Sequence, residues 1–240
     1  MSDRLRFHID RRTIAILLAV VAPLCLFIAA LRVTAQPHTD PVFAVPAAPS
    51  MPYVPHQGFA NSTWFCGGVP TSGKGQGGTV TVANPLDTPL TGHIEVYTDE
   101  SGVALKEQEF EVPARGTYVA DLKSLQPKGT YVSAMVELGG GGGFVEQTAQ
   151  HTDGDAVSPC ANSTSSTWYF ADNYTMGDSK EDIVVTNPFP DDAILNFTFA
   201  NKDGTHSPNV LQGVPVLAHS VLIVNQETLL KDEAIYAVSV

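Results

Sequence analysis

Two cysteines are the residues of this chain whose chemistry is easiest to assign. Cys66 and Cys160 form the only pair outside the apolar N-terminal segment, which holds the third cysteine, Cys25. A disulfide persists in an exported chain, so we predict a bond between Cys66 and Cys160; two buried free thiols are the alternative. Closing a loop of this length could stabilise the fold by up to ~4–5 kcal/mol, provided that the two Cα atoms come within ~7 Å.

Two tryptophans are the candidate ligand contacts. Trp64 and Trp168 stand at corresponding positions of an internal repeat, and an exposed indole at either position could stack on a sugar ring. Packing in a core or between sheets is the alternative. Equivalent placement in both copies favours packing, because aromatic side chains dominate the area that a fold buries.

The remaining polar residues show no catalytic or metal-binding pattern. The sequence contains no Ser-His-Asp elbow, Cys-His pair, HExxH motif or phosphate-binding glycine loop. An acidic region could hold Ca²⁺, but its spacing matches no EF-hand loop and favours solvated turn residues; it comprises Asp172, Asp178, Glu181, Asp182, Asp191 and Asp192. We therefore predict no catalytic residues, no metal, no cofactor and no enzymatic activity.

Charge divides the chain into two unequal parts. Residues 1–35 hold five arginines against two aspartates, about +3, whereas the rest holds 8 Lys+Arg against 23 Asp+Glu, which is -15. An acidic surface of this kind repels nucleic acid and anionic lipid, so we exclude a DNA- or RNA-binding function.

An uncharged apolar segment at 14–31 predicts a transmembrane helix, because eighteen residues are near the lower limit for crossing a bilayer. The basic tail 1–13 outweighs Arg32 on the other side, so the N-terminus is expected in the cytoplasm and the rest outside the cell. A cleaved signal ending near Ala35 is the alternative, but the apolar segment is long for one. Residues 32–58 form a proline-rich stalk, expected to be an extended spacer.

An internal repeat organises the rest of the chain. Residues 62–65 return as 166–169 at an offset of 104, and Val82–Pro85 returns as Val185–Pro188 at an offset of 103. Two further blocks recur in the same order, 97–102 as 199–204 and 112–115 as 216–219. We therefore divide the chain into two copies of one module, 59–160 and 161–240. The Asn-Pro pairs in the repeat are interpreted as turns that end strands.

Each copy has the pattern of short strands. In the first copy β-branched and aromatic residues alternate with polar ones, and we expect strands near 62–66, 78–84, 91–98, 104–112, 116–121, 130–138 and 143–150. A helical turn is expected at 121–125 and again at 226–230. Seven short strands predict a mainly β protein with two tandem immunoglobulin-like β-sandwich modules.

The second copy is shorter than the first. Residues 234–240 correspond to the strand around Tyr131, and no counterpart of 144–148 follows. The second module is therefore expected to lack its last strand and to expose an unpaired edge. Either the chain is a fragment of a longer protein, which we favour, or a partner supplies the strand.

These blocks carry a resemblance to a known family. The STWFCGG block at 62–68, the two V-x-N-P blocks and the STWYFAD block at 166–172 resemble an uncharacterised actinobacterial family of exported, membrane-anchored proteins, defined only as a domain of unknown function. The resemblance covers about 40–240. Because the family has no established activity, it implies no functional residues.

Three functional hypotheses follow. The leading one is a non-enzymatic envelope protein that presents tandem β-sandwich modules to a protein or cell-wall partner, with the membrane bound through the N-terminal helix. The second is a glycan-binding module that uses exposed Trp64 or Trp168. The third is an envelope enzyme whose active site lies in a part missing from this chain.

Overall fold

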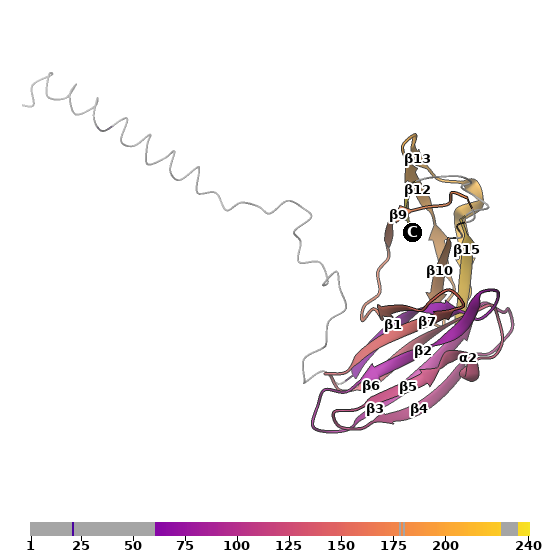
Figure 1. Ribbon diagram of the computed structural model, residues 1–240. Coiled ribbons are helices and arrows are strands. Elements are labelled where there is room, and N and C mark those ends of the chain that lie inside the picture. The colour runs from indigo at the N-terminus through magenta and orange to yellow at the C-terminus, as the bar shows by residue number, and fades with distance from the viewer. Residues whose placement is uncertain (1–20, 22–60, 178, 180, 227–234) are drawn as a thin grey trace, which may run out of the picture. The chain divides into compact units, whose positions relative to one another are not determined.

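Strands dominate the structure of this protein. The computed structural model describes residues 21, 61–177, 179, 181–226 and 235–240 (Figure 1), and those from 61 onward belong to one compact unit. The expected basic tail, membrane segment and stalk lie outside these residues, apart from Val21. The helical turn expected at 226–230 also lies outside them, apart from Gln226. Among the described residues no helix is long and apolar enough to cross a bilayer.

Module 1 contains eight strands in indigo to orange in Figure 1. Seven of them confirm the sequence-based strands within a few residues, and the eighth, β8, was missed because its four exposed residues show no alternation. The strands are β1 (Asn61–Pro70), β2 (Gly75–Ala83), β3 (Leu90–Thr98), β4 (Lys106–Val112), β5 (Thr117–Asp121), β6 (Tyr131–Gly139), β7 (Phe144–His151) and β8 (Ala156–Pro159). The predicted helical turn is α2 (Leu122–Leu125), where the carboxylate of Asp121 accepts a hydrogen bond from the Ser124 N–H.

Two antiparallel sheets form this module, in the orders β1-β6-β3-β4 and β5-β2-β7-β8. Alternate residues of each strand point inward, as the period of two requires. Val80 and Val82 of β2, for example, are both fully buried, as are Ile94 and Val96 of β3 in the facing sheet. One hydrophobic cluster joins residues of both sheets, so module 1 is a β-sandwich.

Module 2 repeats the strand order of module 1. Its strands, orange to yellow in Figure 1, are β9 (Tyr169–Asn173), β10 (Asp182–Asn187), β11 (Ala193–Asn196), β12 (Thr198–Asn201), β13 (Gly204–His206), β14 (Gln212–Val216), β15 (Ser220–Asn225) and β16 (Tyr236–Ser239), with a 3-10 turn η2 (Asn209–Leu211). The order β9-β16-β12-β13 reproduces β1-β6-β3-β4, and the pair β10-β15 reproduces β2-β5. The counterparts of β3 and β4 are each split in two.

One sheet of module 2 is narrower than its counterpart. In module 1, β2 pairs with β5 on one edge and with β7 on the other. Among the described strands, β10 pairs with β15 alone. Alternate residues of an antiparallel strand direct their N–H and C=O groups to each edge, so half of the β10 backbone groups face away from β15.

The two modules are in contact through β10 and the outer face of the β1-β6-β3 sheet. The Thr186 hydroxyl donates to the Ser133 hydroxyl at 2.8 Å. The Tyr131 hydroxyl donates to a carboxylate oxygen of Asp182 at 3.3 Å. Burial, together with the nearby Asp182 charge, raises the pKa of Tyr131 to about 12.

The predicted disulfide is confirmed. Cys66 of β1 is bonded to Cys160, which directly follows β8, with the two Cα atoms 4.5 Å apart. Both residues are buried, and the backbone of Ala161 exchanges two hydrogen bonds with Phe65 beside the bond. The bond therefore joins the first strand of one sheet to the end of the last strand of the other.

A buried asparagine directly follows β2, and another is the last residue of the equivalent strand β10. The amide nitrogen of Asn84 lies within 2.8 to 3.2 Å of three backbone oxygens, those of Thr88, Val112 and Pro113, and its side-chain oxygen accepts from the Leu86 N–H. Asn187 makes the corresponding four contacts in module 2, to Asp191, Val216, Leu217 and Phe189. The Asn-Pro turns are thus structural, and the amide side chain ties each turn to the end of a neighbouring strand.

We expect the disulfide to contribute ~2–5 kcal/mol to the free energy of unfolding, because it closes a loop with a sequence separation of 94. The double variant Cys66→Ala/Cys160→Ala should lower the urea midpoint of module 1, followed by the fluorescence of buried Trp64. Reductant should lower the midpoint of the natural chain and leave that of the double variant unchanged. Equal midpoints for both proteins would contradict the expectation.

Replacing Asn84 with alanine should cost about 2–3 kcal/mol, because buried backbone oxygens lose their donor. The corresponding variant Asn187→Ala should destabilise module 2. Asn209→Ala is the matched control, since Asn209 is exposed. The check is urea unfolding of the three variants, and a loss at Asn209 equal to that at Asn84 would argue against the role of the buried amide.

Candidate functional site

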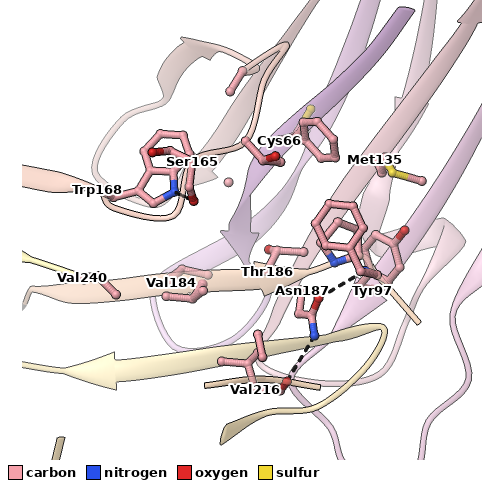
Figure 2. A pocket seen from close by; sticks show the side chains of 18 of the residues that line it. Cys66, Tyr97, Met135, Ser165, Trp168, Val184, Thr186, Asn187, Val216 and Val240 are labelled. Carbon is pink, nitrogen blue, oxygen red and sulfur yellow. Dashed lines mark hydrogen bonds between the residues drawn. The ribbon is translucent and has the colours of Figure 1, made fainter. Parts of the chain in front are cut away.

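An apolar pocket of about 620 Å³ lies where the two modules meet. Figure 2 shows it with Cys66, Tyr97 and Met135 of module 1 and with Trp168 and Val240 of module 2. None of the described residues that line it is an Asp, Glu, Lys, Arg or His. In a chain with a net charge of -12, such a lining favours an uncharged ligand over an ionic one.

Module 1 supplies one wall from the outer face of its β1-β6-β3 sheet. Phe65 and Met135 are direct cross-strand partners in the β1–β6 register, and Tyr97 lies two strands away on β3. Inward-facing neighbours such as Trp64 and Val136 fill the core, so alternation directs Phe65 and Met135 outward. Tyr97 is fully buried, with its ring 6.2 Å from the stacked ring of His219.

Module 2 supplies the opposite wall from β9 and the end of β16. Trp168 directly precedes β9, and its backbone exchanges hydrogen bonds of 2.9 and 3.0 Å with Val240. The indole N–H of Trp168 donates to the Ser165 carbonyl at 3.1 Å, which fixes the orientation of the ring. Trp168 is 45% exposed and Phe170 is 37% exposed. Two large aromatic side chains of this wall are therefore accessible to a ligand.

Strand β10 borders the pocket between these walls. Val184 and Thr186 point toward module 1, where the Thr186 hydroxyl contacts Ser133, whereas the alternate residues Ile183 and Val185 pack with the core of module 2. The turn that follows carries Phe189, which is 47% exposed and lies 6.3 Å from the ring of Phe65. The pocket thus combines apolar side chains with the edge of β10 that faces away from β15.

The two candidate tryptophans differ in environment. Trp64 is fully buried, with its ring packed edge-on against Phe144 of β7 at 5.6 Å. Trp64 therefore cannot contact a ligand in this structure. The prediction of Trp64 as a possible ligand contact is corrected, because Trp64 is a core residue. Trp168 occupies the corresponding position of module 2, where no described strand corresponds to β7, and it remains half-exposed.

The acidic region does not form a cation site among the described residues. Glu181 accepts from the Tyr174 N–H and the Tyr236 hydroxyl. Asp182 accepts from Tyr131 and from the Asn225 amide, and Asp192 from the Ala218 N–H. These carboxylates satisfy local donors at separate places. Asp182 begins strand β10 and Asp172 lies in β9, so these two are not the turn residues that the sequence suggested, and Asp178 lies outside the described residues.

A histidine surrounded by glutamates was not recognised in the sequence. His93 Nδ1 lies 2.9 Å from Glu109, and its Nε2 lies 3.6 Å from Glu95 and 3.8 Å from Glu107. The four residues are cross-strand neighbours on the outer face of β3 and β4, so the signal was the alternation H-x-E and E-x-E on paired strands. Neighbouring side chains on paired strands account for the group, and no second feature of the described residues points to a bound cation.

Comparisons with known proteins place no function on this site. No family model matches the chain, and no curated protein matches it. Solved structures similar to part of the chain include the Thermotoga maritima protein 1070, with 14% identity and a TM-score of 0.34 over 41% of this chain and 91% of that one. Another is the Anabaena sensory rhodopsin transducer, with 20% identity and a TM-score of 0.27 over 39% of this chain and 98% of that one. At these TM-scores the similarity supports no conclusion about function.

The exposure difference predicts the fluorescence of the two tryptophans. The variant Trp64→Phe reports on Trp168 alone, and the variant Trp168→Phe reports on Trp64 alone. Trp168 should emit at longer wavelength than Trp64, and acrylamide should quench it several-fold more strongly, because quenching requires contact with solvent. The check is a Stern–Volmer titration of the folded variants. Equal quenching constants would show that Trp168 is covered in solution.

Proposed function

We propose that this chain is a non-enzymatic protein of the cell envelope, anchored by 14–31, whose tandem β-sandwich modules bind a protein partner through the pocket beside Trp168. The observation that carries the proposal is the uncharged pocket itself. Accessible aromatic side chains occur there together with an edge of β10 that no described strand pairs with. Soluble domains rarely leave such apolar surface exposed unless it binds something.

The disulfide supports the proposal that the two modules lie outside the cell. The Cys66–Cys160 bond is buried beside the core of module 1. Structural disulfides of this kind persist in oxidising compartments and are rare in the cytosol. The bond fits the orientation in which the basic tail stays inside and the modules lie outside.

An immunoglobulin-like fold is proposed for the inner strands of the modules. In that fold the second and fifth strands are neighbours in one sheet, and the third and sixth are neighbours in the other. The pairs β2–β5 and β3–β6 follow this arrangement, and module 2 repeats it. The first strand, β1, instead pairs with β6, and β7 pairs with β2, so the outer strands depart from it. Among the described strands of module 2, none is the counterpart of β7.

Glycan binding is the second candidate, and the exposure of Trp168 favours it. An accessible indole held by a hydrogen bond to Ser165 could stack on a sugar ring. The pocket also offers hydroxyl groups that could hydrogen-bond a sugar, among them those of Ser158, Ser163, Thr164, Ser165 and Ser166. We rank a protein ligand first because most of the surface that lines the pocket is apolar.

A photo-crosslinking amino acid at position 189 should capture one recurrent envelope protein in living cells, because Phe189 borders the pocket. The matched control carries the same amino acid at position 119, since Val119 is similarly exposed but lies on β5 of module 1. Products are identified by mass spectrometry after purification of the membrane-bound, full-length chain. Identical products at both positions, or none at 189, would contradict protein binding at the pocket. Retention on purified cell-wall glycan that is lost in Trp168→Ala would favour the second candidate instead.

A further inference from the structure

We draw no further inference here: the strongest candidate, the side-chain cluster of His93 with Glu95, Glu107 and Glu109 on the outer face of β3 and β4, carries nothing, because no second observation on the described residues points to a ligand there.

Discussion

The constraint on which this structure depends is that an inner strand of a sheet needs a hydrogen-bonded neighbour at each of its two edges. β2 meets it with β5 on one side and β7 on the other, and the core of module 1 closes around Trp64. β10 meets it on one side only among the described strands. Among the described residues, the exposure of Trp168 and the pocket beside it accompany that single difference.

The two modules share a strand order but differ in the residues at equivalent positions. In module 1 the position of Cys66 carries a disulfide that holds the last strand to the first. Phe170 stands at the corresponding position of module 2, where it faces the pocket. The asparagine contacts are the same in both, so the amides of Asn84 and Asn187 hold the common framework. The framework is thus independent of the disulfide, and module 2 keeps its strand order without one.

Contact between the modules buries side chains on the outer sheet face of module 1. Phe65 and Tyr97 point away from the core of module 1, and in an isolated sandwich they would face solvent. Packing of β10 and its neighbours buries Tyr97 completely and places Phe65 beside Phe189. An outer sheet face thereby becomes a wall of the pocket, which gives a docked ligand apolar contacts on two sides.

The sequence by itself determined seven of the eight strands of module 1, the turn at Asp121 and the Cys66–Cys160 pair, because alternation, capping and cysteine count are local or simple signals. The sequence favoured packing for both Trp64 and Trp168, because similar STW blocks carry them, yet Trp168 is 45% exposed. Only the tertiary structure decided it: burial depends on whether a strand distant in sequence lies over the ring, and Phe144 covers Trp64 while no described residue plays that part for Trp168. The same holds for the pocket, because its walls come from two modules whose contact has no local signature.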